Sequence, residues 1–462
     1  MEQPPGFEVP GKEEWVMKLI KSIYGMKQVS HIWNQTFHKA VSEWPFECLP
    51  CEWCICHWTS PTGTIIFTVH IDDIIVASSS VAEVDCFHDF LKPQWEITEL
   101  GEPNYALDIA ISHNQPAQTI SISQTTKIDN LLEQYGQVNV HLVDTPMVLG
   151  LQLHQPDKSM PVPYNVEKWM EQTPYHPLVE SLMYLAVATH PNISDAVSCL
   201  WSFLDCYRHK HWDAAIQILR YLKGTQSHAL TLSGTNPLSL SSYSNSNYTN
   251  CMDTSWSVGG YCFTLGSSMI SWSSQKQKTV VDSSCYPEYI ALHNASHKVI
   301  FLRQLLKGLQ LLPNGPMQLL CDNDATSRLT EDHVWHSHTK HIQVRYHYTH
   351  ELVLAGECSV LCVGSKDNIA NILTKPLAHS DFQQLCHYLG VQATTPMWGG
   401  VRWCQSWGGV FPFLFLFFLF TVSSFISCCD IICFFHFFIS SNISHHDIIM
   451  IHSLLAQCQG GV

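Results

Sequence analysis

The sequence predicts a fold of the mixed α+β and α/β class, in which helices pack against mixed sheets and an apolar tail follows. Residues 1 to about 145 alternate strand-like and helix-like patterns, residues 175–224 have helical apolar spacing, and residues 238–361 return to strand, helix, strand. Such alternation is typical of a mixed sheet covered by helices. The 462 residues, 46% of them hydrophobic, are enough for two or three domains with cores of their own.

The first part of the chain is expected to contain a strand pair, two helices and two short strands. Residues 64–77 (TIIFTVHIDDIIVA) are rich in β-branched side chains, which predicts a hairpin or a buried strand pair. A helix is predicted at 81–92, short strands at 105–111 and 119–123, and a second helix at 124–135.

A linker and a helical stretch are expected next. Residues 144–174 are rich in proline, which predicts a linker. Leu178, Leu182 and Leu185 then recur at the spacing of one helix face, so we expect a helix that buries them.

The tail from residue 393 onward differs in composition from the rest of the chain. Residues 410–426 (VFPFLFLFFLFTVSSFI) are uncharged and apolar, and they approach one membrane span, for which roughly 17–25 residues are needed. Two interpretations stay open: a helix inserted in a membrane, and accidental translation of T-rich DNA without an evolved role. Residues 1–12 are polar and contain no apolar run, so no signal peptide is expected there.

The charge balance is unusual for a protein that binds nucleic acid. The formal net charge is −15, and only six residues are arginine, whereas histidine (27), cysteine (19) and tryptophan (15) are abundant. Arginine codons become Cys, Trp, His or Gln codons by single C-to-T or G-to-A changes. The composition therefore indicates mutational decay of the coding DNA, and the alternative is a genuinely acidic protein rich in histidine and cysteine.

Two adjacent carboxylates interrupt the apolar run near residue 70. Asp72 and Asp73 lie between β-branched residues on both sides. Strand alternation would turn one aspartate to each face, and burying either charge is costly, so a tight hairpin that exposes both is predicted. Such a pair can hold Mg²⁺ for nucleotidyl transfer, although an isolated Asp-Asp pair is also typical of a solvated turn.

Several motifs around this pair occur in one order along the chain. They are MEQPPGFE at 1–8, IYGMKQ at 23–28 followed by Trp33, IDD at 71–73, LG at 100–101 and YALDIAI at 105–111. Together they resemble the reverse transcriptase of copia-type retrotransposon Pol polyproteins, and the resemblance extends over roughly residues 1–390. The ordered set is far more specific than any one of its members.

This resemblance implies a partial polymerase palm and connection. Asp72 and Asp73 would be Mg²⁺ ligands, and Gly25, Lys27 and Gln28 would lie near the incoming nucleotide and the template. In the family, the first catalytic aspartate lies upstream of the PPGFE segment. We therefore expect a polymerase site that lacks one carboxylate and the fingers.

Two substitutions depart from the family pattern in this part of the chain. His31 stands where the family has arginine, and Asp108 stands where it has glycine. The second change is expected to place a charge in a packed hairpin. Both changes follow from the same C-to-T and G-to-A process.

Four later segments resemble the surroundings of the RNase H carboxylates of the same family. They are YSNSN at 243–247, SSCYPEY at 283–289, CDN at 321–323 and IANILTKPL at 369–377. The resemblance implies an RNase H-like mixed sheet with flanking helices. In such an enzyme, a ring of carboxylates holds two Mg²⁺ ions that activate water and stabilise the leaving oxygen.

The ring itself is altered in this sequence. Glu288 and Asp322 remain acids and are the predicted catalytic and metal-binding residues, whereas Asn245 and Asn371 stand at aspartate positions. An amide offers a carbonyl oxygen without negative charge, so metal affinity and catalysis are both expected to fall.

Two clusters have the spacing of metal sites. The stretch CLPCEWCICH at 48–57 has zinc-like or iron–sulfur-like spacing, and a histidine-rich run extends from 333 to 350. The surplus cysteines also fit the arginine-to-cysteine drift. In the histidine run, TKHI at 339–342 resembles a family segment, so Lys340 and His341 are predicted to contact nucleic acid.

The expected protein is a fragment of an RNA-directed DNA polymerase and ribonuclease H that is inactive by itself. The alternative is a non-catalytic nucleic-acid-binding or interaction protein derived from a retroelement. The expected partners are an RNA/DNA template-primer or an RNA–DNA hybrid, bound weakly, and a membrane if the tail inserts; the expected location is the cytoplasm or nucleus. The predicted domains are 1–145 (truncated polymerase), 146–235 (linker and helical connection), 236–392 (RNase H-like) and 393–462 (tail).

Overall fold

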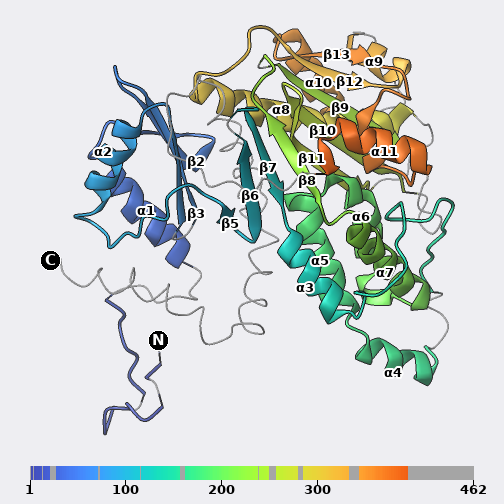
Figure 1. Ribbon diagram of the computed structural model, residues 1–462, viewed down its shortest axis with the longest axis horizontal. Helices are drawn as coiled ribbons and strands as arrows, with labels where there is room; N and C mark the ends of the chain where they lie inside the picture. Colours follow the sequence, from blue (N-terminus) through green and yellow to red (C-terminus); the bar gives the residue numbers. More distant parts are fainter. Residues whose placement is uncertain are drawn as a thin grey trace. The chain divides into compact units, whose positions relative to one another are not determined.

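The computed structural model describes residues 2–393 with gaps, and the chain forms two compact units that divide between Ile97 and Thr98 (Figure 1). The residues outside the description are 1, 4, 13, 21–27, 71–72, 115, 157–161, 238, 249–255, 279–284, 332–342 and 394–462. The predicted domain limits at residues 145, 235 and 392 remain predictions.

The first unit is a four-stranded antiparallel sheet with two helices. Its strands lie in the order β1-β2-β3-β4. The elements are α1 (Val29–Val41), β1 (Glu47–Leu49), β2 (Glu52–Thr59), β3 (Thr64–His70), β4 (Asp73–Ser78) and α2 (Val81–Leu91). Aromatic side chains form its core: Phe67 of the sheet stacks on Phe87 of α2 at 4.7 Å, and Phe37 of α1 meets Phe67 edge-on.

The hairpin predicted at residues 64–77 is present. Strands β3 and β4 are antiparallel, and His70 pairs with Asp73 at its tip. Ile65, Ile66 and Phe67 are buried, which explains the run of apolar and β-branched residues in this stretch.

The second unit contains a sheet assembled from distant segments of the chain. It is antiparallel, in the order β14-β8-β7-β6-β5. The strands are β5 (Tyr105–Ala106), β6 (Ile109–Asn114), β7 (Thr119–Ser123), β8 (His228–Ser233) and β14 (Val391–Ala393). Residues near 120, 230 and 392 thus share one sheet.

The turn between β5 and β6 corrects one expectation. Asp108 was expected to place a charge in a packed hairpin, but its side chain is 54% exposed and lies 3.6 Å from Nζ of Lys127. Leu107 and Asp108 have φ angles of 53° and 57°, in the left-handed region. A two-residue hairpin turn needs this backbone conformation, which glycine adopts without the steric cost that other residues meet.

A helical layer lies between β7 and β8 along the chain. Its elements are α3 (Thr125–Gln134), α4 (Tyr164–Gln172), α5 (Tyr175–Ala188), η1 (Pro191–Ile193), α6 (Ser194–Trp201), η2 (Leu204–Cys206) and α7 (His209–Gly224). Figure 1 shows α5, α6 and α7 bundled together. Leu178, Leu182 and Leu185 are fully buried, as their spacing predicted.

The third sheet has five strands in the order β11-β10-β9-β12-β13. Strands β9, β10 and β11 form an antiparallel meander, whereas β12 runs parallel to β9 and β13 runs parallel to β12. The strands are β9 (Leu240–Asn247), β10 (Val258–Leu265), β11 (Ser268–Lys276), β12 (Met317–Cys321) and β13 (Cys358–Cys362). The predicted mixed sheet is therefore confirmed.

Helices connect or follow the strands of this mixed sheet along the chain. They are α8 (Cys285–Gly308), α9 (Asp324–Glu331), α10 (Gln343–Leu354), η3 (Ile369–Leu373) and α11 (His379–Tyr388). Helix α8 packs on β9 and β10 through buried residues such as Leu292, Val299 and Leu302. The arrangement confirms the α+β and α/β class predicted from the sequence.

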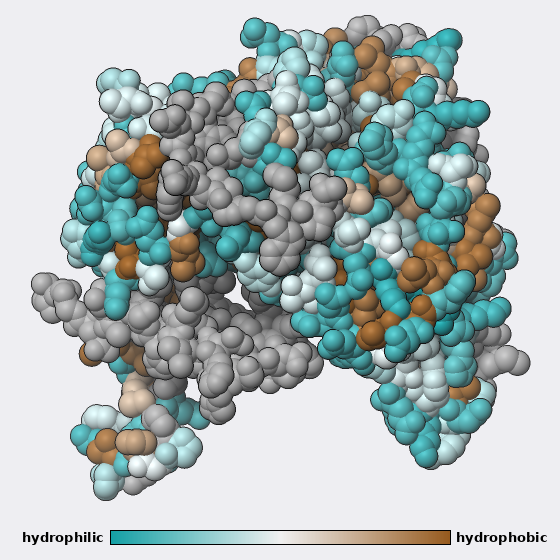
Figure 2. All heavy atoms as spheres, in the orientation of Figure 1, coloured by the Kyte–Doolittle hydropathy of each residue, from teal (hydrophilic) through white to brown (hydrophobic). Residues whose placement is uncertain are grey.

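Polar side chains dominate the part of the surface that Figure 2 draws in colour, with brown hydrophobic groups scattered among them. Within the described parts of the chain, we find no helix with both the length and the apolar character needed to cross a membrane. The predicted span at residues 410–426 lies outside those parts.

Candidate functional site

Two neighbouring parallel strands position the first pair of ring residues. Ser244 of β9 pairs with Cys321 of β12, so the residues that follow them, Asn245 and Asp322, lie at the same end of the sheet. Asn245 is buried, whereas Asp322 is half-buried. The adjacency follows from the parallel register, which aligns the carboxyl ends of the strands.

Glu288 reaches the same place from the first turn of α8. It is only 8% exposed, and its Oε2 atom has no hydrogen-bond partner among the described residues. Burial, the largest cause, and the charge of Asp322 together raise the pKa of Glu288 to about 8, against the opposite effects of Ser246 and Lys375. Near neutral pH, this carboxyl therefore keeps its proton.

Asn371 completes the ring from η3. Nδ2 of Asn245 donates hydrogen bonds to Oδ1 of Asn371 and to Oγ1 of Thr374, both at 2.9 Å. Nδ2 of Asn371 donates in turn to the backbone carbonyls of Ser365 and Asn368. The two amides therefore bind each other and the neighbouring backbone.

A glycine allows η3 to approach the sheet this closely. Gly260 of β10 pairs with Asn245, and a Cβ atom at residue 260 would lie 2.8 Å from Cβ of Leu373. No side chain fits in that space, so glycine here lets Asn371 reach Asn245.

The structure thus brings together all four ring positions predicted from the sequence. Their chemistry does not fit a pair of divalent cations, because two neutral amides face each other where the family has carboxylates. Glu288 and Asp322 are the two remaining acids, and Ser365 Oγ donates to Asp322 Oδ2 at 2.8 Å. The unpartnered Oε2 of Glu288 is the one buried carboxylate oxygen of the ring left open to a ligand in the described structure.

The predicted polymerase residues belong to the first unit. Asp73 begins β4 and is exposed, and Gln28 is exposed at the start of α1. Asp72, Gly25 and Lys27 lie outside the described residues. Lys340 and His341, the predicted nucleic-acid contacts near the RNase H segments, also lie outside them.

Sequence reasoning missed the residues that support the ring. Ser365, Asn368 and Thr374 contact Asp322, Asn371 or Asn245 through hydrogen bonds, and Lys375 lowers the pKa of Glu288. All but Ser365 lie in or beside the segment at 369–377 that was singled out for Asn371 alone. The signal that could have identified them is the presence of side-chain hydroxyl and amide groups in and beside that segment.

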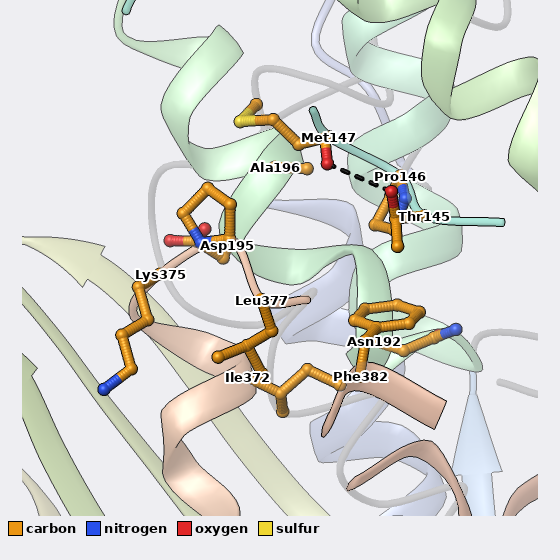
Figure 3. A pocket seen from close by; sticks show the side chains of 11 residues that line it. Thr145, Pro146, Met147, Asn192, Asp195, Ala196, Ile372, Lys375, Leu377 and Phe382 are labelled. Carbon is orange, nitrogen blue, oxygen red and sulfur yellow. Dashed lines mark hydrogen bonds between the residues drawn. The ribbon is translucent and has the colours of Figure 1, made fainter. Parts of the chain in front are cut away.

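A buried carboxyl in a small cavity was also missed. Figure 3 shows this cavity, where Asp195 of α6 and Lys375 are among the lining residues, together with Asn192 and Phe382. Burial raises the pKa of Asp195 to about 7. No salt bridge to this carboxyl forms within the described part of the chain.

Comparison with known proteins gives the same family for the sequence. Residues 1–149 match the family described as reverse transcriptase (RNA-dependent DNA polymerase). The chain is 32% identical over 398 residues to the retrovirus-related Pol polyprotein from transposon TNT 1-94 of Nicotiana tabacum, covering 84% of this chain and 29% of that protein. It is 32% identical over 403 residues to the Pol polyprotein from transposon RE2 of Arabidopsis thaliana, covering 87% and 27%.

The chain therefore spans less than a third of the length of these relatives. Among solved structures, it is similar to a foamy viral protease–reverse transcriptase in complex with an RNA/DNA hybrid (TM-score 0.39, 12% identity, 75% of this chain and 39% of that chain). It is also similar to an N-terminal RNase H domain from Mycobacterium tuberculosis (TM-score 0.22, 11% identity, 33% and 98%).

The mixed sheet and its four ring positions define an RNase H-like domain, which follows a reverse-transcriptase segment in the same chain. Enzymes of these two classes generally use divalent metal ions. The chain belongs to the Pol polyproteins of copia-type retrotransposons, of which it is a fragment.

Proposed function

We propose that this fragment keeps the nucleic-acid-binding fold of a Pol RNase H domain but hydrolyses RNA–DNA hybrids at or near the background rate. The hydrogen bond between Asn245 and Asn371 supports this proposal, because it joins two neutral amides where the family places two metal-binding carboxylates. The alternative is a non-catalytic binding or interaction protein, for which restoring the carboxylates of the ring should not restore hybrid cleavage.

The charge in the ring explains the proposed loss of activity. Hydrolysis of a phosphodiester by this class needs enough negative charge to hold two Mg²⁺ ions beside the scissile phosphate. The amides at residues 245 and 371 remove two of the four charges, and the raised pKa of Glu288, about 8, removes most of a third near neutral pH.

For the first unit, we propose that the β3–β4 hairpin marks the metal position of a polymerase palm. Asp73 is exposed at the start of β4, at the tip of a hairpin in which Ile65, Ile66 and Phe67 of β3 are buried. An exposed carboxylate at a tight turn can reach a hydrated Mg²⁺ ion. Templated DNA synthesis by this fragment would depend on this hairpin and not on the ring that would cleave an RNA–DNA hybrid.

Restoring the ring tests the proposal for the RNase H domain. Cleavage of an RNA–DNA hybrid is measured with Mg²⁺ for the unmodified chain, for N245D, for N371D and for the double variant. We expect background cleavage for the unmodified chain, little change for either single variant and a clear rise for the double variant, because the carboxylates act as one unit.

Two controls accompany this measurement. Adding Glu288→Gln to the double variant should return cleavage to background, and Asn236→Asp, which adds a charge in an exposed loop, should not raise it. Rapid hybrid cleavage by the unmodified chain would contradict the proposal. Failure of the double variant to cleave, with its fold intact, would favour the binding-protein alternative.

A further inference from the structure

Three soft or borderline metal ligands meet in the first unit. His38 lies on α1, Cys48 on β1 and Cys56 on β2. Their ligand atoms all lie within 4.8 Å of one another. Strand register explains the cysteine pair, because Cys48 and Cys56 face each other across β1 and β2, where they form a disulfide.

The histidine of this cluster is oriented and has one nitrogen to spare. The backbone carbonyl of Trp53 accepts a hydrogen bond from the His38 ring, and the Trp53 ring meets that ring edge-on at 5.4 Å. Nε2 of His38 is buried without a hydrogen-bond partner among the described residues. The donor to Trp53 is therefore Nδ1, which leaves the Nε2 lone pair free. A metal-binding histidine is typically held by such a bond from its other ring nitrogen.

The burial of Nε2 of His38 also favours a ligand at this atom. A buried ring nitrogen without a partner costs free energy, and a cation would remove that cost.

We propose that Cys48 and Cys56, when reduced, form with Nε2 of His38 a binding site for a thiophilic divalent cation, Zn²⁺. With Zn–S distances of about 2.3 Å and a Zn–N distance of about 2.0 Å, tetrahedral coordination separates the ligand atoms by about 3.5–3.8 Å. The two sulfurs, bonded in the disulfide, separate to that distance on reduction, and all three ligand atoms already lie within 4.8 Å of one another. Water takes the fourth position.

The disulfide and the Zn²⁺ site are alternative states of the same two sulfurs. A dithiol reductant attacks the disulfide, passes through a mixed disulfide and leaves as its own cyclic disulfide, so that Cys48 and Cys56 each gain one electron and one proton. Zn²⁺ then binds the two thiolates, and their two protons pass to solvent. Oxidation therefore closes the site and reduction opens it.

A cysteine two residues from Cys56 provides a matched control. Cys54 lies on β2 as well, but it is not part of the three-ligand cluster. Its removal should therefore leave metal binding unchanged.

Cobalt titration of the full chain tests the proposal, because Co²⁺ bound to thiolates absorbs visible light. With a phosphine reductant and without oxygen, we expect one equivalent of Co²⁺ to give this absorption and Zn²⁺ to displace it. Cys48→Ser and His38→Ala should each weaken this equivalent by about 100-fold or more, the upper end of what losing a supporting residue costs. Cys54→Ser should leave its affinity unchanged.

Oxidation gives a second measurement that needs no variant. The unmodified chain with the disulfide formed should lose this equivalent and regain it on reduction. Absence of Co²⁺ absorption in the reduced chain, its persistence in Cys48→Ser, or its equal loss in Cys54→Ser would each overturn the proposal. Circular dichroism of every variant identifies unfolded samples, for which the oxidation cycle decides.

Discussion

Asp195 is an acidic side chain that the fold buries. It lies on α6 and lines the small cavity in Figure 3, and burial is the cause of its raised pKa of about 7. Its folded-state pKa therefore exceeds its usual value of 3.8. The stability that the protonated carboxyl permits is fully present below pH 3.8 and is lost as pH rises through about 7.

We predict that Asp195→Asn stabilises the chain at pH 8 but has little effect at pH 4. At about 1.4 kcal/mol for each tenfold change in the proton equilibrium, the pKa difference corresponds to about 4 kcal/mol at pH 8. Urea unfolding at both pH values measures the effect. The exposed Asp205→Asn is the control, and an equal response of both variants would contradict the prediction.

The turn at Leu107 and Asp108 leads to a second prediction. Asp108→Gly should stabilise the second unit by about 1 kcal/mol, because a left-handed residue other than glycine costs roughly 1–2 kcal/mol. The lost ion pair with Lys127 offsets this by less than about 1 kcal/mol, since the carboxylate is exposed. Thermal unfolding measures the change, and Asp108→Asn separates the charge from the backbone. A lower melting temperature for the glycine variant would show that the ion pair dominates.

At the scale of single residues, the sequence identified the residues of the ring better than it predicted the burial and contacts of other side chains. The motifs around Asn245, Glu288, Asp322 and Asn371 identified the ring because each is a local pattern. The burial of Asp195 and the meeting of His38 with two cysteines depend on contacts between separate elements, which no local pattern records.

Between elements, the main structural consequence of the altered ring is a hydrogen-bonded contact between β9 and η3. The hydrogen bonds of Asn245 to Asn371 and Thr374 join these elements without a cation. Two aspartates at residues 245 and 371 would instead place like charges about a hydrogen bond apart, and buried like charges repel unless a cation lies between them.

We therefore predict that the double variant N245D/N371D is less stable than the unmodified chain in EDTA. A loss of roughly 2–4 kcal/mol is expected from the missing hydrogen bonds and the buried charges. Mg²⁺ should restore part of it. Thermal unfolding with and without Mg²⁺ measures both effects, and a double variant as stable in EDTA as the unmodified chain would contradict the prediction.

The sequence predicted strongly patterned elements better than short ones. The β3–β4 hairpin and the buried helix α5 were expected, because their apolar patterns extend over many residues. Strand β14 was not expected: it has three residues and pairs with residues far away in the chain. Such strands form because a neighbouring edge offers hydrogen bonds, and their own sequence does not determine them.

For the whole molecule, net charge should control binding to nucleic acid. With a formal charge of −15, the chain has few cations to neutralise phosphates. We predict weak binding to an RNA–DNA hybrid, with a Kd of about 10⁻⁶ M or higher and a marked further loss between 50 and 200 mM salt. Filter binding at these two salt concentrations measures it. Tight binding that salt hardly changes would contradict the prediction.

The sheet that joins β5, β6, β7, β8 and β14 also constrains the order of events during synthesis. Residues 228–233 leave the ribosome more than 150 residues before their partner at 391–393. Until β14 arrives, β8 presents an open strand edge on that side, and such edges pair readily with other chains. For much of its translation, the nascent chain therefore has a sheet that still lacks its edge strand β14. Aggregation during synthesis should therefore fall when translation is rapid or when a chaperone covers that edge.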